Sequence, residues 1–360
     1  MSLQDRDLMA PAQPVAACDH GAHAVLVGLD IGISTTKIAH QIGLDGEPVV
    51  HRLPSRALPI NNSQLLAIGG GVRPFDSTVL VHQQPWMAAI NSPFLGHNHS
   101  QDDKHFEESP EWLAHARAAL ARLEQPRISE LVVGIPLTHL LIPGRRELAS
   151  TRLLGMHPLH DGGGIEIERV TVVPSSMGAQ ILWDIQFRVC SGRIIDVDAP
   201  VLVIDCGHRT VSWMLIRGHA IQRHLSAESA GAGARLQRRA RALLRKQLKQ
   251  KVSVARMEWR CRQANRWMDL GKATINLDAY LQEASLSIVP RAIEALKASL
   301  KPHKDSLHSI VLTGGLSKLF APAITVAFPH ALIACLADPT TANARGLLQI
   351  ARRLHSPETD

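Results

Sequence analysis

The polar loop from Asp30 to Lys37 directly follows an apolar segment, 24–29, and holds residue types that bind phosphate. Successive backbone N–H groups of such a loop form a concave anion site, and hydroxyl and ammonium groups add hydrogen bonds to phosphate oxygens. A carboxylate beside it suits Mg²⁺, which keeps several of its own waters. We therefore expect a loop that binds phosphate, with Asp30 as a metal ligand, formed by Asp30, Gly32, Ser34, Thr35, Thr36 and Lys37.

A second loop of the same kind follows the apolar segment 199–204, about half the chain further on. Asp205 and Gly207 repeat the Asp-x-Gly pattern, and Thr210 adds a hydroxyl. Each loop leads into another strand-like segment, which is a hairpin pattern. This indicates an internal duplication whose two halves face each other across a cleft. We expect Asp205 to hold a metal or the attacking water, and Gly207 and Thr210 to face phosphate.

A third glycine-containing segment ends the strand expected at 308–313. Two adjacent glycines let a nucleotide base or ribose lie against the backbone at the start of a helix. One Asp-x-Gly or Gly-Gly usually marks an ordinary turn, but three such loops at strand ends in this order favour one shared site. The expected contacts are Thr313, Gly314, Gly315 and Ser317.

The positions of these loops depend on alternating strand and helix patterns along the chain. We expect a helix at 111–125, a buried strand at 128–135, one strand over 165–173 and a helix that begins at Ser175. The segment 53–110 is rich in Pro, Gly, Asn and His and is expected to be irregular. Pro290 is expected to kink or interrupt a helix at 277–300.

Composition excludes several classes of protein. The 360 residues are 45% hydrophobic and 20% charged, which argues against disorder. No stretch of about 18 apolar residues predicts a membrane span, and the N-terminus does not resemble a signal peptide. Five scattered cysteines without a C-x-x-C pair do not indicate disulfides or a zinc ribbon. A soluble cytoplasmic protein is expected.

Positive charge is concentrated in the stretch from Arg235 to Asn276, which has 13 Lys or Arg and two acidic residues. Its net charge is +11, against +7 for the whole chain, so the remainder carries −4. The stretch is either a solvated helix face or a surface for an anion. Such an anion could be a nucleotide, a nucleic acid or an acidic neighbouring subunit.

Several segments resemble the actin-like ATPases of the ParM/StbA plasmid-segregation type, within the actin, sugar kinase and heat-shock-chaperone ATPase superfamily. LDIGISTTKIA and VIDCGHRTVSW resemble the two phosphate loops, and VLTGGLSKLF resembles the adenosine motif. LVVGIPLTHL, VTVVPSSMGAQ and ADPTTANARGLLQIA resemble further stretches of that family. The likeness covers about 24–354, although 53–110 and 235–276 contribute little.

The resemblance implies an α/β fold with two ribonuclease-H-like domains of actin type flanking a nucleotide cleft, each with a smaller inserted subdomain. The expected divisions are a disordered tail at 1–22, domain I at 23–183 plus 338–354 with an insertion at about 53–110, and domain II at 184–337. Domain II would carry a helical basic insertion at about 228–300.

The resemblance also implies a function: a filament-forming protein that binds ATP or GTP with Mg²⁺ and hydrolyses it to drive plasmid DNA segregation. Its partners would be further copies of itself, head to tail, and a DNA-binding adaptor, with DNA contact through 235–272 as a further option and no membrane partner. Two alternatives remain open. One is a nucleotide-binding scaffold with little or no hydrolysis, and the other is a small-molecule kinase on the same fold.

Ser175 is the main departure from the family pattern. That position follows Pro174 and carries Glu or Gln in the family, where it positions the attacking water; Ser175 is the corresponding catalytic candidate here. A serine hydroxyl can bond a water but is a poor general base without a partner. Hydrolysis is therefore expected to be slow or to take its base from elsewhere, such as Asp205. Arg209 in the second loop could stabilise phosphate charge or point to solvent.

Overall fold

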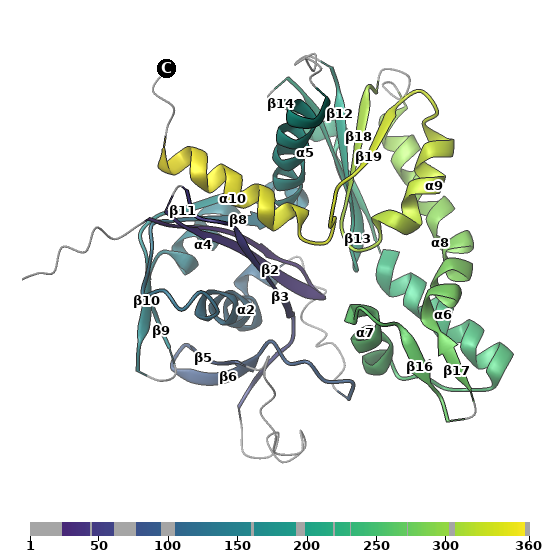
Figure 1. Ribbon diagram of the computed structural model, residues 1–360, viewed down its shortest axis with the longest axis horizontal. Coiled ribbons are helices and arrows are strands. Elements are labelled where there is room, and N and C mark those ends of the chain that lie inside the picture. The colour runs from purple at the N-terminus through teal and green to yellow at the C-terminus, as the bar shows by residue number, and fades with distance from the viewer. Residues whose placement is uncertain are drawn as a thin grey trace, which may run out of the picture.

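Two mixed β-sheets stand side by side in the computed structural model, with helices between and outside them (Figure 1). The structure describes residues 24–43, 45–60, 77–94, 105–159, 162–191, 199–218, 220–230, 232–271, 273–301 and 307–356. The tail at 1–22 and the segment 95–104, which contains His97, His99, Asp102 and Asp103, lie outside these ranges. Of the helices in the described ranges, none combines the length and apolar character needed to cross a membrane.

The first sheet is formed by five strands in the order β11-β8-β1-β2-β3. β1 is antiparallel to β2 and parallel to β8, which in turn is parallel to β11. β1 and β8 are buried along their whole length, as expected for apolar strands covered on both faces. Helices α2 and α10 cover opposite faces (Figure 1). The bounds are β1 Val25–Ile31, β2 Thr35–Ile42, β3 Val49–Pro54, β8 Glu130–Ile135, β11 Val170–Pro174, α2 Pro110–Ala121 and α10 Ala342–His355.

The second sheet repeats this arrangement in the order β14-β13-β12-β18-β19, with β15 also paired to β13. β12 is antiparallel to β13 and parallel to β18, and β18 is parallel to β19. The strand directions match those of the first sheet position by position, which confirms the predicted duplication. The bounds are β12 Val201–Cys206, β13 Thr210–Arg217, β14 Ala220–Ile221, β15 Ala227–Ala230, β18 Ser309–Thr313 and β19 Leu332–Cys335.

Helices α5 (Ser175–Ser191) and α10 join the two halves, because α10 packs on the first sheet, α5 contacts strands of both sheets, and the two helices pack against each other. The helices cross at Gly178 and Gly346. A Cβ atom built on Gly346 would lie 1.7 Å from the carbonyl oxygen of Gly178, so any side chain there would push the helices apart. Glycine at this crossing permits the close approach that holds the two sheets together.

Smaller elements complete the fold around these sheets. The second half adds α6 (Ala232–Leu248), α7 (Val254–Arg262), the hairpin β16 (Trp267–Asp269) and β17 (Thr274–Asn276), α8 (Leu277–Leu300) and α9 (Ser317–Ala327), with a short turn η3 (Arg223–Leu225). The first half adds β4 Ala57–Pro59, β5 Ser77–Val81, β6 Gln84–Ala88, η2 Phe106–Glu108, β7 Arg127–Ile128, α3 Leu137–Leu140, α4 Arg145–Leu153, β9 Gly155–Pro158 and β10 Gly164–Ile167.

Two expectations about local structure were wrong, and of the two outcomes expected at Pro290 one, an interruption of the helix, does not occur. The segment 53–110 is not irregular throughout, because β4, β6 and β5 form an antiparallel sheet. The segment 165–173 is not one strand: it is divided between β10 and β11, which belong to different sheets. Pro290 does not interrupt α8, since it lies on an exposed face where solvent can satisfy the carbonyl group that loses its partner. The domain divisions remain a prediction, and the one between 183 and 184 passes through α5.

Candidate functional site

A cavity of about 270 Å³ lies between the two halves, and all three glycine-containing loops reach it. Loop residues come from the carboxyl ends of β1, β12 and β18 and from the hairpins that follow β1 and β12. Eleven of the fourteen predicted site residues line this cavity: Asp30, Gly32, Ser34, Thr35, Lys37, Ser175, Asp205, Gly207, Thr210, Gly314 and Gly315. Segments as far apart in the sequence as Asp30 and Gly315 therefore meet at one place.

In the first loop, Lys37 and Asp30 face each other across the β1–β2 hairpin, where they are paired residues. The Nζ atom of Lys37 lies 3.0 Å from Oδ2 of Asp30. Thr36 points away from the cavity because neighbouring side chains in a strand alternate between faces. Its hydroxyl lies 2.8 Å from the hydroxyl of Ser55, which also donates to the carbonyl oxygen of Gly32. Ser55 thus supports the loop from behind.

The second loop lies against the Gly314 turn. A Cβ atom on Gly314 would lie 2.4 Å from Oδ1 of Asp205, and the φ angle of Gly314 is 86°, so this position requires glycine. The side-chain amide of Asn343 in α10 donates to Oδ2 of Asp205 at 2.8 Å. Burial raises the pKa of Asp205, the nearby Asp30 carboxylate raises it further, and Lys37 and Asn343 partly offset both effects.

Three predicted residues, Thr36, Thr313 and Ser317, are buried and are not among those that line the cavity. The Thr313 hydroxyl donates to the carbonyl oxygen of Pro339 at 3.0 Å, and Ser317 lies at the start of α9 next to Cys335. Their hydroxyl groups therefore serve the surrounding backbone and core. This geometry gives no support to the expected contact between these hydroxyls and a ligand.

Ser175 lies at the edge of the first sheet where β1, β8 and β11 end side by side. The strand register places Asp30 beside Gly134 and Ile135 beside Pro174. A Cβ atom on Gly134 would lie 2.9 Å from the Ser175 hydroxyl oxygen. The side chain of Ser175 is therefore close to the first loop and at the cavity wall, as the motif predicts.

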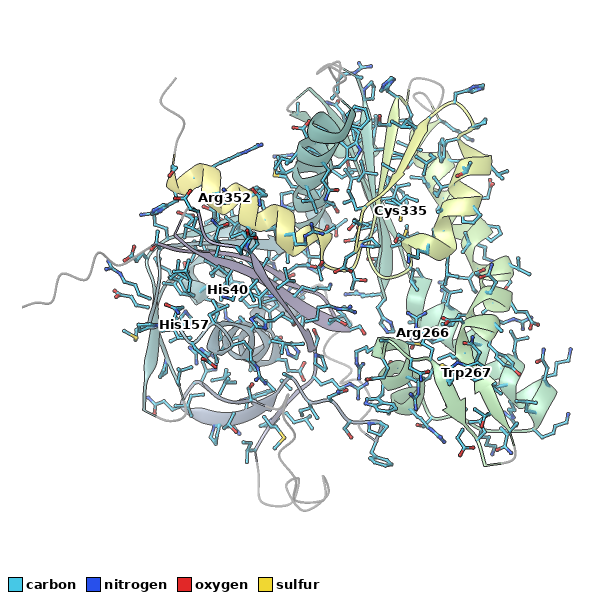
Figure 2. All side chains as sticks on the ribbon, in the orientation of Figure 1. His40, His157, Arg266, Trp267, Cys335 and Arg352 are labelled. Carbon is cyan, nitrogen blue, oxygen red and sulfur yellow. The ribbon has the colours of Figure 1, made fainter. Side chains whose placement is uncertain are left out.

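Sequence reasoning missed Asn343, which contacts Asp205, and Arg52 of the cavity wall. The lining includes five cations, Lys37, Arg52, Arg209, Arg262 and Arg266, and four carboxylates, Asp30, Glu107, Asp205 and Glu228. Burial and the nearby Arg56, opposed by Glu258, lower the pKa of Arg262 to about 10. Figure 2 marks Arg266, which pairs with Asp278 at 2.7 Å. The excess of positive groups suits an anionic ligand.

Residues 28–178 match the family of actin-like proteins in its N-terminal domain. The fold is actin-like. An archaeal actin homologue, Ta0583, superposes with a TM-score of 0.71 at 20% identity, over 91% of this chain and 99% of that chain. Two ParM structures, a non-polymerisable pCBH mutant and a 15-stranded filament from Clostridium botulinum, each give 0.68 at 18% identity, over 92% of this chain and 99% of theirs.

No curated protein sequence is significantly similar to the chain. The likeness to solved structures therefore establishes the fold, and the role of each cavity residue is argued from its own contacts.

Proposed function

We propose that this protein binds ATP with Mg²⁺ in the cavity between the two sheets, assembles into filaments and hydrolyses the nucleotide. The observation that carries the proposal is the convergence of both Asp-x-Gly loops and the Gly314-Gly315 turn on one cavity. Two similar structures agree with it: Ta0583 was solved in complex with ADP, and the Clostridium botulinum ParM was solved as a filament. A binding competition between ATP and GTP would show which of the two nucleotides the protein prefers.

Asp30 and Asp205 are the residues that would hold Mg²⁺. The Asp30 carboxylate raises the pKa of Asp205, so the two groups repel each other across the cavity, and a divalent cation would offset that repulsion. Two carboxylates suit Mg²⁺, which completes its shell with water and substrate phosphates and would neutralise phosphate charge there. The donor set therefore fits this metal.

Sedimentation of the purified protein with and without ATP, together with phosphate release, tests the proposal. Pelleting that depends on ATP and is followed by phosphate release supports an assembling ATPase. Binding and pelleting without release would instead support the nucleotide-binding scaffold. Phosphate transfer that requires an added small molecule, without pelleting, would support a kinase. A protein that does not bind ATP or GTP at all would contradict the proposal.

Lys37→Ala is expected to weaken ATP binding. The ammonium group lines the cavity, and the loss of one charged hydrogen bond costs roughly 1.5–3 kcal/mol. Isothermal titration calorimetry measures this loss. Lys318→Ala is the matched control, because Lys318 lies on α9 just after the Gly314 turn but is exposed and not part of the lining. Equal affinity of Lys37→Ala and the parent protein would exclude the assigned role.

We propose further that assembly drives plasmid DNA segregation through a DNA-binding adaptor, and that the basic stretch contacts the next subunit. On α6, Leu236 and Leu243 are buried, whereas Arg238, Arg239 and Arg245 are exposed. Arg241 differs from them, because its Nε donates to the Val252 carbonyl oxygen at 2.7 Å and so holds the chain after α6. The exposed arginines form the surface available to an acidic partner.

Replacement of Arg238, Arg239 and Arg245 by Ala is expected to raise the critical concentration for assembly about tenfold. Three exposed ion pairs of about 0.5 kcal/mol each account for that factor. Assembly of the parent should also weaken as salt rises, because such pairs are screened within about 8–10 Å at physiological salt. Light scattering measures both effects. The control removes the same charge from Arg291 and Lys297 on α8 and from Lys301 just after it.

Direct DNA contact is the other use of this stretch. It predicts retention of duplex DNA at low salt without nucleotide, with affinity that falls log-linearly as salt rises. If assembly does not depend on salt and the protein does not retain DNA, the basic stretch is only a solvent-exposed helix face without an anionic partner.

A further inference from the structure

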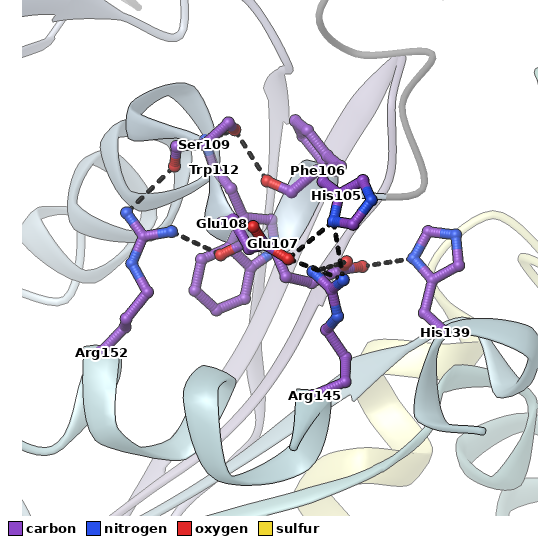
Figure 3. A network of polar contacts seen from close by, with 9 residues as sticks. All are labelled: His105, Phe106, Glu107, Glu108, Ser109, Trp112, His139, Arg145 and Arg152. Atoms are coloured by element: carbon purple, nitrogen blue, oxygen red, sulfur yellow. Dashed lines mark hydrogen bonds and ion pairs between the residues drawn. The ribbon is translucent and has the colours of Figure 1, made fainter. Parts of the chain in front are cut away.

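A buried polar network surrounds Glu107, in the short turn η2 before α2 (Figure 3). Oε1 of Glu107 lies 2.7 Å from Nδ1 of His139 on α3, and Oε2 lies 3.7 Å from Arg145 on α4. The Glu107 side chain is 1% exposed and that of His139 is 7% exposed. Burial of a carboxylate and an imidazole is costly unless they are hydrogen-bonded, and the contact between Glu107 and His139 meets that need.

The pair belongs to the wall of the cavity, since Glu107 and His139 both line it. α3 begins two residues after Ile135, which the strand register places beside Pro174. His139 therefore projects from the same sheet edge that carries the first loop and Ser175. That edge is where the water that attacks the terminal phosphate of ATP would lie if the proposed function is right.

The hydrogen bond to Glu107 defines the chemistry of His139. A carboxylate accepts from a protonated nitrogen, so in the neutral imidazole the proton is assigned to Nδ1 and Nε2 has the free electron pair. Within the described part of the chain, Nε2 of His139 makes no hydrogen bond. An imidazole oriented by a carboxylate, with its second nitrogen free, is the arrangement of an activated general base.

We propose that His139 is the general base for ATP hydrolysis in this protein and that Glu107 is its positioning residue. The inference rests on the proposed function and supplies the group that Ser175 lacks. Nε2 of His139 takes a proton from water as the water oxygen bonds to the γ-phosphorus. The bond from that phosphorus to the bridging oxygen breaks, ADP and inorganic phosphate leave, and the imidazole returns the proton to solvent.

The neighbouring charges keep Glu107 in place. Arg145 lies between Glu107 and Glu108, 2.8 Å from the latter, and His105 lies 2.7 Å from Glu108. Arg152 donates to the backbone carbonyl oxygens of Glu107 and Ser109, which fixes η2 itself (Figure 3). The acceptor for Nδ1 of His139 is thus held from both the side chain and the main chain.

Single-turnover phosphate release, with ATP affinity measured separately, tests the proposal. His139→Ala is expected to slow release by about 10²–10⁴-fold with affinity unchanged. Imidazole added to the buffer should restore part of the rate, which a structural role would not allow. Glu107→Gln should slow release less, because it keeps the shape of the pair. His157→Gln is the control, since His157 is also a buried histidine but does not line the cavity.

The proposal is overturned if His139→Ala releases phosphate at a rate within about threefold of the parent rate. It is also overturned if added imidazole does not restore the lost rate although His139→Gln has the same melting temperature as the parent protein. A parent protein that binds ATP but never releases phosphate would overturn it while leaving nucleotide binding intact. A parent protein that binds no nucleotide would overturn the proposed function and this inference together.

Discussion

Asp205→Asn is expected to bind ATP yet hydrolyse it at least about 10²-fold more slowly than the parent protein. The carboxylate lies at the end of β12, in the cavity wall opposite Asp30, where it would hold Mg²⁺ or orient the attacking water. An asparagine keeps the shape but supplies no negative charge for the metal. Phosphate release under single-turnover conditions measures the loss.

The fold should tolerate this change. The Asn343 amide now donates to Oδ2 of Asp205 at 2.8 Å and can donate equally to an amide oxygen. The space beside Gly314 is also unchanged, because the two side chains are nearly the same size. Glu228→Gln is the control, since it removes another carboxylate of the cavity wall that has no proposed part in the reaction. Similar rates for Asp205→Asn and Glu228→Gln would remove Asp205 from the mechanism.

The sequence predicts the duplicated core well because its signals are local. Each Asp-x-Gly loop ends an apolar run and starts a second strand, and short-range hairpin pairing follows directly from that pattern. Burial on both faces explains why β1 and β12 read as continuous apolar segments. Two hairpins of the same kind are sufficient to indicate two similar sheets.

The parts that the sequence does not predict depend on contacts between distant residues. Glu107 and His139 are 32 residues apart, and Asp205 and Asn343 are 138 apart, so no local spacing relates either pair. The hydroxyls of Thr36 and Thr313 illustrate the same limit. Each belongs to a loop motif, yet strand alternation and core packing turn each away from the cavity.

The small sheet formed by β4, β5 and β6 was also missed. Its strands are three to five residues long, and Pro59 and Pro85 lie within them, which weakens any strand signal. Whether such a short strand forms depends on the neighbouring strands that pair with it, because a two- or three-residue sequence pattern occurs often by chance.

Ser175→Glu combined with His139→Gln is expected to raise hydrolysis by about 10²-fold or more over His139→Gln alone. Ser175 begins α5 and lines the cavity, so a longer side chain there can extend toward the attacking water. A carboxylate at a helix N-terminus is also electrostatically favoured. In the parent background the gain should be much smaller, because His139 already accepts the proton.

Ser175→Gln in the same background separates two ways of helping the reaction. An amide can orient a water but cannot take its proton, so this variant should recover less of the rate than Ser175→Glu. Phosphate release and ATP affinity are measured for four proteins: the parent, Ser175→Glu, His139→Gln and the double variant. Equal acceleration by Ser175→Glu in both backgrounds would mean that the two positions act independently, and His139 would then not be the base that compensates for serine at 175. Acceleration confined to the His139→Gln background would show that one proton-accepting group is needed and that either position can supply it.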